Sequence, residues 1–116
     1  MNINFWQTQN GRSPVLSFIE DQDTKASARM IKDLERLEEK GLALLADHNK
    51  LKRFHGHKNM YEIKTYFKGV YYRIIFTILN GEAWLLEAFK KKSDDTPIRY
   101  IKNALHRKNI LVTITH

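Results

Sequence analysis

The chain has 116 residues, of which 42% are hydrophobic, and this is enough for one domain with a single core. It has no cysteine, which excludes disulfide bonds, thiolate nucleophiles and thiolate metal sites. No segment approaches the roughly 20 apolar residues of a membrane span, and the N-terminus does not read as a signal peptide. We therefore expect a single cytoplasmic domain over residues 1–116.

The net charge of +7 is unevenly distributed along the chain. Residues 50–116 contain 14 Lys and Arg against 5 Asp and Glu, whereas residues 1–49 contain 6 against 8. The basic residues lie next to aromatic ones, as in the segments 51–58 and 89–92. Such a distribution is typical of a surface that meets phosphate groups, so RNA binding is the first function to consider.

The first half of the chain predicts a short strand followed by helices. Residues 3–7 mix apolar and polar side chains like an edge strand. Ser13 can cap a helix that begins at Pro14 and ends near residue 20. A second helix starts near residue 23 or 24, with apolar residues at helical spacing up to Leu37, and ends at Gly41. Residues 42–45 can add one short turn.

The second half predicts an antiparallel meander and a closing helix. Segments 60–67, 70–79 and 83–89 alternate as strands do, with turns at Lys68-Gly69 and Asn80-Gly81. Thr96-Pro97 begins a helix. Residues 110–114 read either as a strand or as a frayed end. The fold class is therefore α+β, with N-terminal helices packed on a small antiparallel sheet and a closing C-terminal helix.

One face of this meander is expected to gather positive charge. Arg73 lies mid-strand, Lys64 lies on the preceding strand, and three lysines leave the last strand at residues 90–92. Arg and Lys donors fixed around one phosphodiester suit phosphoryl transfer, because developing negative charge must be stabilised. The expected RNA-binding residues around this centre are Lys52, Arg53, Lys58, Tyr71, Lys90, Lys92 and Tyr100.

Each of these residues also has a purely structural interpretation. Arg73 can pair with Glu62 or Glu87, since structural ion pairs are common. The lysines at 90–92 can form a solvated strand end, and strand tyrosines such as Tyr71 often pack across a sheet. Histidines 55 and 57 lack the further ligands of a metal site. We expect no metal and no cofactor.

The order of short motifs along residues 10–108 resembles the HigB branch of the RelE-like toxins of bacterial type II toxin–antitoxin modules. Each motif is weak alone, but their order and spacing together are fairly specific. The motifs are Gly11-Arg12-Ser13-Pro14-Val15, Phe18-Ile19, Leu34-x-x-Leu37-x-x-x-Gly41, Leu51-Lys52, Tyr61-Glu62-Ile63-Lys64, Tyr72-Arg73-Ile74, Leu85-Leu86-x-Ala88-Phe89-x-Lys91-Lys92 and Thr96-Pro97 before a helix with Ala104.

The resemblance implies a RelE-like domain that enters the ribosomal A site and cleaves mRNA there. It implies neutralisation by a HigA-like helix-turn-helix antitoxin. The family's strand arginine falls on Arg73, its preceding basic residue on Lys64, and its basic residue after the last strand on Lys91, with Lys90 or Lys92 as alternatives. These three positions are the expected catalytic residues, and an aromatic of some relatives corresponds to Tyr100.

Two departures from the family pattern leave the general base open. Glu62 stands where some relatives have a second basic residue, and the histidine that certain branches place near the end of the last strand is absent. Glu62, Tyr72, His55 and His57 each remain candidates for the base. Two other functions also remain: a non-catalytic RNA- or ribosome-binding module, and a protein-interaction domain that docks an acidic partner.

Overall fold

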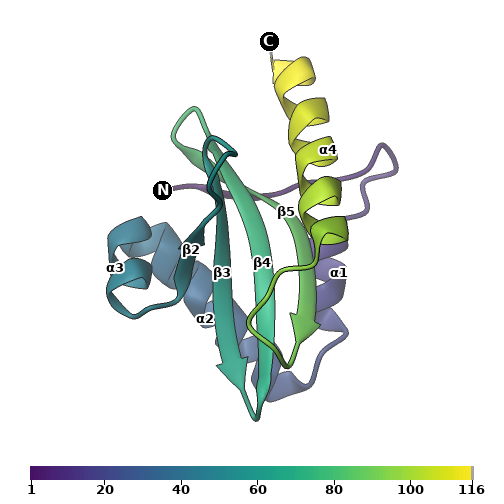
Figure 1. The fold of residues 1–116 in the computed structure, drawn as a ribbon. Helices are drawn as coiled ribbons and strands as arrows, with labels where there is room; N and C mark the ends of the chain where they lie inside the picture. Colours follow the sequence, from purple (N-terminus) through teal and green to yellow (C-terminus); the bar gives the residue numbers. More distant parts are fainter. Residues whose placement is uncertain (116) are drawn as a thin grey trace.

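The computed structural model describes residues 1–115 and confirms the α+β fold class (Figure 1). N-terminal helices, a five-stranded, mostly antiparallel sheet and a closing helix follow one another along the chain. The elements are β1 (Ile3–Phe5), α1 (Pro14–Glu20), α2 (Thr24–Lys40), α3 (Leu42–Asp47), β2 (Leu51–Arg53), β3 (Met60–Phe67), β4 (Val70–Leu79), β5 (Glu82–Lys91) and α4 (Ile98–Thr115).

The strands form one sheet in the order β1-β5-β4-β3-β2, in which β1 runs parallel to β5 and all other neighbours are antiparallel. Both hairpins of the meander turn through two residues with positive φ. These are Lys68 and Gly69 between β3 and β4, and Asn80 and Gly81 between β4 and β5. Such two-residue turns match the twist of paired strands and fix their register.

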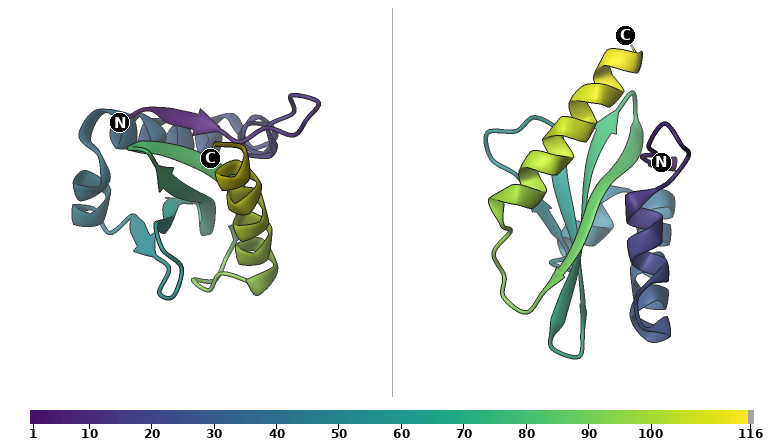
Figure 2. Two further views of the ribbon diagram at one scale, coloured as in Figure 1. Left: turned by 90° about the horizontal axis from the view of Figure 1, so that it is seen from above. Right: turned by 90° about the vertical axis from the view of Figure 1, so that its right-hand side faces the viewer.

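Helices cover the sheet on both faces (Figure 2). α1 and α2 lie on one face, which we call the helix-pair face, and α4 crosses the other, which we call the α4 face. A large apolar cluster fills the helix-pair face, with Val15, Ile19, Met30, Leu37, Ile63, Ile74, Phe76 and Leu85 among its members. A smaller cluster lies beneath α4 and contains Phe54, Met60, Ile75, Leu86, Phe89 and Ala104.

Local signals set the helix boundaries that the sequence predicted. The Ser13 hydroxyl accepts a hydrogen bond from the Leu16 amide at 3.2 Å, and Pro14 begins α1. α2 ends at Gly41, whose φ of 75° is readily accessible to glycine. Residues 110–114, left open above, continue α4 up to Thr115. Among residues 1–115, no helix combines the length and apolar character that crossing a bilayer requires.

A register shift interrupts the pairing of β4 with β5 between Ile75 and Phe76. Leu85 pairs with Phe76 and Glu87 pairs with Ile75, so Leu86 is the extra residue of a β-bulge. Leu85 packs in the helix-pair cluster, whereas Leu86 packs beneath α4. The bulge places two consecutive residues, Leu86 and Glu87, on the α4 face, where Glu87 pairs with Arg107 of α4.

Candidate nucleic-acid interface

The α4 face carries a cluster of positive side chains beyond the part that α4 covers. Lys64 of β3 pairs directly with Arg73 of β4, as the short turn between these strands predicts. In the next row of paired residues on this face, Tyr71 of β4 lies between Tyr66 of β3 and Lys91 of β5. The structure therefore brings Lys64, Arg73, Tyr71 and Lys91 together on one face of three neighbouring strands.

Arg73 is completely buried and is held by acidic partners. Its Nη1 donates to Glu62 Oε1 at 3.1 Å, and its Nη2 donates to Asp94 Oδ1 and to the Ser93 carbonyl, both at 3.0 Å. Of the two partners that the sequence left open, Glu62 is the one observed. Glu87 instead pairs with Arg107 of α4 at 3.4 Å. The guanidinium carbon of Arg73 also lies 5.1 Å from the centre of the Tyr71 ring.

Asp94 lies in the loop between β5 and α4 and is shared by two cations. The same Oδ1 atom is 3.0 Å from Arg73 Nη2 and 3.6 Å from Lys64 Nζ. The Arg73 hydrogen bond, followed by the positive charge of Lys64, lowers the pKa of Asp94 below its usual value. Because its side chain is 72% exposed, Asp94 is the solvent-facing member of this group.

Asp95 gives Lys91 an equivalent partner from the same loop. Lys91 Nζ donates to Asp95 Oδ2 at 2.6 Å, and the Ser93 hydroxyl donates to Asp95 Oδ1 at 2.6 Å. These two hydrogen bonds, that of Lys91 first, lower the pKa of Asp95 to about 2. At neutral pH, two ionised carboxylates of one loop therefore lie against the cations of the sheet.

Lys52 joins the same face through β2, where it pairs in register with Glu62. Its Nζ donates to the Thr96 hydroxyl at 3.4 Å, and Thr96 donates to Glu62 Oε2 at 2.8 Å. Both carboxylate oxygens of Glu62 are thus occupied, one by Thr96 and one by Arg73. The buried carboxylate anchors the start of α4 as well as the arginine.

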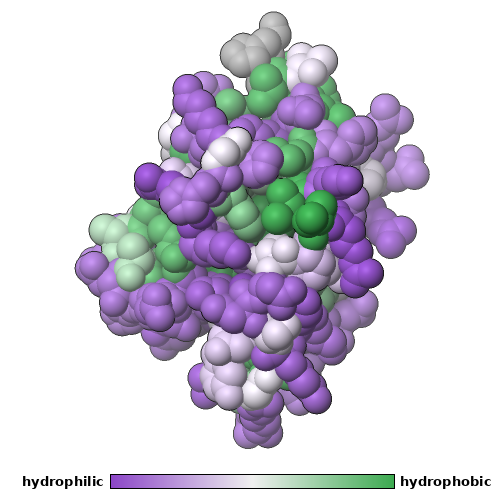
Figure 3. Space-filling model, viewed as in Figure 1, coloured by the Kyte–Doolittle hydropathy of each residue, from purple (hydrophilic) through white to green (hydrophobic). Residues whose placement is uncertain are grey.

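An open cavity of about 280 Å³, which we call the Lys64 groove, borders this cluster. Its walls come from the connection between α3 and β2, the second half of β3, the start of β4 and the β5–α4 loop. Figure 3 shows the α4 face, where hydrophilic residues dominate the lower part of the molecule and hydrophobic ones gather over α4. The lining residues are His48, Asn49, Lys50, Lys64, Tyr66, Tyr71 and Asp94.

Several predicted RNA-binding residues lie outside this cluster. Arg53 packs over Tyr61, which belongs to the helix-pair cluster, and Lys58 is exposed in the connection between β2 and β3. Lys90 pairs with Tyr72 and so lies on the face opposite Lys91, while Lys92 follows the end of β5.

Tyr100 stacks on Phe89, with ring centres 4.1 Å apart and planes 4° apart. Phe89 is the β5 residue that pairs with Arg73, so this stack adjoins the cluster without being part of its cationic row. The arrangement anchors the first turns of α4 on the sheet.

The structure narrows the candidates for a general base. Tyr72 is buried in the helix-pair cluster, away from the α4 face, and Glu62 is fully buried in its ion pair. His55 and His57 lie in the connection between β2 and β3. Asp94, which the sequence analysis missed, is the carboxylate in contact with Lys64 and open to solvent. The sequence feature that could have identified Asp94 is the acidic pair Asp94-Asp95 directly before Thr96-Pro97, between the last predicted strand and the closing helix.

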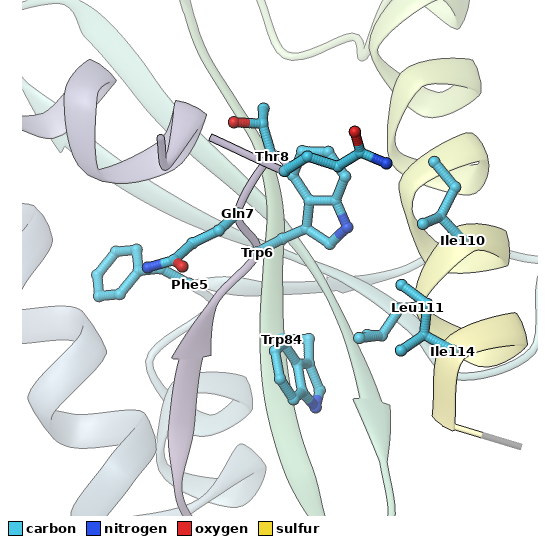
Figure 4. Close-up of a pocket in the computed structure, with 9 residues that line it drawn as sticks. Phe5, Trp6, Gln7, Thr8, Trp84, Ile110, Leu111 and Ile114 are labelled. Atoms are coloured by element: carbon cyan, nitrogen blue, oxygen red, sulfur yellow. The ribbon is translucent and has the colours of Figure 1, made fainter. Parts of the chain in front are cut away.

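A separate cavity of about 560 Å³ has a different chemical character. Trp6, from the segment after β1, and Trp84 of β5 lie across from Ile110, Leu111 and Ile114 of α4 (Figure 4). The described residues that line it carry no charge, so it cannot stabilise a phosphate in the way the sheet cluster can. Within residues 1–115, no three His, Asp or Glu side chains are grouped as a metal site requires.

The fold and the cluster define a small α+β domain with a cationic sheet face. Residues 17–109 match the model of the phage-derived Gp49-like protein family (DUF891), and the chain belongs to this family. The family is related to the HigB and RelE-like toxin families, is associated with toxin–antitoxin systems, and is often paired with antitoxins. No curated protein matches the chain.

Proposed function

We propose that this protein is the toxin of a type II toxin–antitoxin module and cleaves mRNA in the ribosomal A site. Its activity would be neutralised by a HigA-like helix-turn-helix antitoxin. Membership of a family associated with such modules supports the proposal, as do the cations on the α4 face. The excess of Lys and Arg in residues 50–116 supports ribosome binding, because RNA binding requires many phosphate contacts.

The observation that carries the proposal is that Lys64 and Arg73 converge on a single anionic oxygen. In the free protein this oxygen is Oδ1 of Asp94. A non-bridging oxygen of a phosphodiester has similar hydrogen-bonding capacity and partial negative charge. When RNA binds, such an oxygen would take the place of the Asp94 carboxylate, and a second phosphate oxygen would take the place of Asp95 at Lys91.

The cleavage step needs these cations together with a proton acceptor and a proton donor, which solvent water supplies. The 2′-hydroxyl of the substrate attacks the adjacent phosphorus and passes its proton to water, while the bond from phosphorus to the 5′-oxygen breaks. The 5′-oxygen takes a proton from water, so the products are a 2′,3′-cyclic phosphate and a 5′-hydroxyl. Arg73 and Lys91 stabilise the added negative charge, and Lys64 positions the phosphate or lowers the pKa of the attacking hydroxyl.

The test uses lysine variants, because Arg73→Ala would leave Glu62 buried and without its cation. Wild type, Lys64→Ala and Lys91→Ala are added to a bacterial translation extract, and mRNA breaks are mapped by primer extension. Each variant is expected to cleave about 10²–10³-fold more slowly. Lys25→Ala, an exposed position of α2, is the matched control and should cleave like wild type.

The complete burial of Arg73 in an ion pair supports a second candidate function. In this alternative the domain binds RNA or the ribosome without cutting. The same extract distinguishes the two functions, because the alternative predicts translation inhibition or ribosome association without mRNA breaks. Breaks that are as abundant with Lys64→Ala and Lys91→Ala as with wild type would overturn the proposed catalytic site.

A further inference from the structure

A second cationic cavity, of about 320 Å³, lies beside the Lys64 groove and has no role in the proposed reaction. It is bordered by α2, by Lys50 just before β2 and by β3 where β3 extends past β2. We call it the α2 groove. Its lining residues are Arg29, Lys32, Asp33, Arg36, Lys50, Thr65 and Tyr66.

The one carboxylate in the α2 groove is already satisfied. Asp33 is buried and accepts hydrogen bonds from Arg36 Nη1 at 2.9 Å, Lys50 Nζ at 3.2 Å and Thr65 Oγ1 at 2.6 Å. The groove contains four cations, which are Arg29, Lys32, Arg36 and Lys50. Asp33 holds Arg36 and Lys50 in fixed positions, but its single negative charge balances only one positive charge. The groove keeps a net positive charge, as an anion site requires.

Arg29 and Lys32 supply the charge that is not balanced. Both are exposed, and within residues 1–115 neither forms a salt bridge. Arg29 is held in place by Phe67 of β3, because its guanidinium carbon lies 4.8 Å from the centre of that ring. Two open cations at the mouth of the groove are available to bind an anion.

The α2 groove adjoins the Lys64 groove, since Lys50 and Tyr66 line both cavities. Tyr66 is 53% exposed, and its ring centre lies 5.1 Å from that of Tyr71. Along β3, Tyr66 follows Lys64 by two residues, which corresponds to about 7 Å. An exposed aromatic side chain flanked by cations on both sides is the pattern that single-stranded RNA binding uses, with bases on the rings and phosphates on the cations.

We propose that the α2 groove binds a backbone phosphate of the same single-stranded RNA whose scissile phosphate lies at Lys64 and Arg73. This inference rests on the proposed function, and it assigns Arg29 and Lys32 to the second phosphate along the strand from the scissile one and Tyr66 to a base between the two sites. The two adjacent phosphates of a three-nucleotide RNA cannot reach both sites. A strand long enough to reach both grooves gains contacts that a shorter one cannot make.

The test compares Arg29→Ala/Lys32→Ala with Arg12→Ala/Lys40→Ala, which removes the same two residue types at exposed positions outside both grooves. Binding of fluorescent single-stranded RNAs of three and nine nucleotides is measured by anisotropy over a range of salt. The first variant should bind the nine-nucleotide RNA more weakly. The slope of log affinity against log salt should fall by about 0.7, as expected for the loss of one phosphate contact on a single strand.

Three further measurements separate the loss of a phosphate contact from a general loss of charge or of the fold. The three-nucleotide RNA should bind equally to both variants, and the control should keep the wild-type salt slope. The charge-preserving variant Arg29→Lys/Lys32→Arg should bind the nine-nucleotide RNA like wild type. Thermal unfolding of each variant shows whether the fold is retained.

Equal loss of the salt slope in the two alanine variants would overturn the subsite, as would wild type that does not bind the longer RNA. Selective loss of binding to polyglutamate, with RNA binding unchanged, would assign the groove to an acidic protein instead. The cleavage assay judges the proposed function separately. Cleavage without any effect of Arg29→Ala/Lys32→Ala on RNA binding refutes the subsite alone, and groove-dependent binding without cleavage refutes the endonuclease alone.

Discussion

Arg73 and Lys64 lie opposite one another on adjacent strands and contact the same carboxylate oxygen of Asp94. Arg73 is fixed from behind by Glu62, whereas Asp94 approaches from an exposed loop. The two acidic partners therefore have different roles. Glu62 holds Arg73 inside the folded protein, and Asp94 occupies the position that the proposed function gives to a phosphate of the RNA.

Asp94→Asn is expected to tighten RNA binding. The substitution removes the charge that competes with phosphate but leaves a side chain of the same shape. Because Asp94 is exposed, its ion pairs are screened by solvent and weak, so the affinity for single-stranded RNA should rise by no more than about fivefold. Fluorescence anisotropy measures this change, and Asp47→Asn, at an exposed position of α3, is the matched control. Weaker binding by Asp94→Asn would mean that Asp94 itself contributes to the RNA site.

Glu62→Ala is expected to destabilise the fold strongly. Both members of its ion pair are fully buried, so the substitution leaves the Arg73 charge without its fixed partner. Breaking a buried pair in this way lowers the free energy of unfolding by about 3–5 kcal/mol. Urea denaturation measures it, and the double variant Glu62→Met/Arg73→Met should recover most of the loss. A cost below about 1 kcal/mol for Glu62→Ala would show that Asp94 and the Ser93 carbonyl suffice.

Asp95 makes the attachment of the β5–α4 loop sensitive to acid. Its pKa is lowered from 3.8 to about 2 in the folded protein, so the folded state favours the ionised form. The resulting stabilisation is fully present above pH 4 and is lost as the pH falls towards 2. Wild type should therefore lose more thermal stability between pH 5 and pH 2.5 than Asp95→Asn does. Equal losses in the two proteins would contradict this attachment.

Asp33→Ala is expected to destabilise the junction of α2 with β3. The buried carboxylate accepts hydrogen bonds from Arg36, Lys50 and Thr65, and hydrogen bonds to charged groups contribute about 1.5–3 kcal/mol. The free energy of unfolding, from urea denaturation, should fall by roughly that amount. Asp33→Asn keeps one acceptor and should lose less. If both variants lose the same amount, charge rather than hydrogen bonding dominates at this site.

The fold was predictable where neighbouring residues decide the structure. Ser13 and Gly41 mark helix ends, and the Lys68-Gly69 turn sets the register that places Lys64 against Arg73. The last turns of α4 were not predictable, because the β-branched residues at 110–114 also suit a strand. Burial of Leu111 in the packed helix outweighs that preference.

The candidate site was predictable only in part, because its closure depends on contacts between distant segments. Arg73 and Asp94 are 21 residues apart, and local sequence does not show that the loop folds back over the sheet. The choice of Glu62 over Glu87 as the partner of Arg73 likewise depends on the position of α4, since Arg107 takes Glu87. The α2 groove was missed because it joins a helix to strands of the other half of the chain.

The extra residue at Leu86 determines which lysine lies on the α4 face of the sheet beside Tyr71. With an uninterrupted register, Lys90 would stand opposite Tyr71, and Lys91 would point towards α1 and α2. Deleting Leu86 would remove the bulge and leave Glu87 paired with Ile75 and Lys91 paired with Tyr71. In the present chain, the extra residue is what keeps Lys91, rather than Lys90, on this face. Among relatives, gaining or losing a single residue here would shift the sequence position of this lysine without altering its place in space.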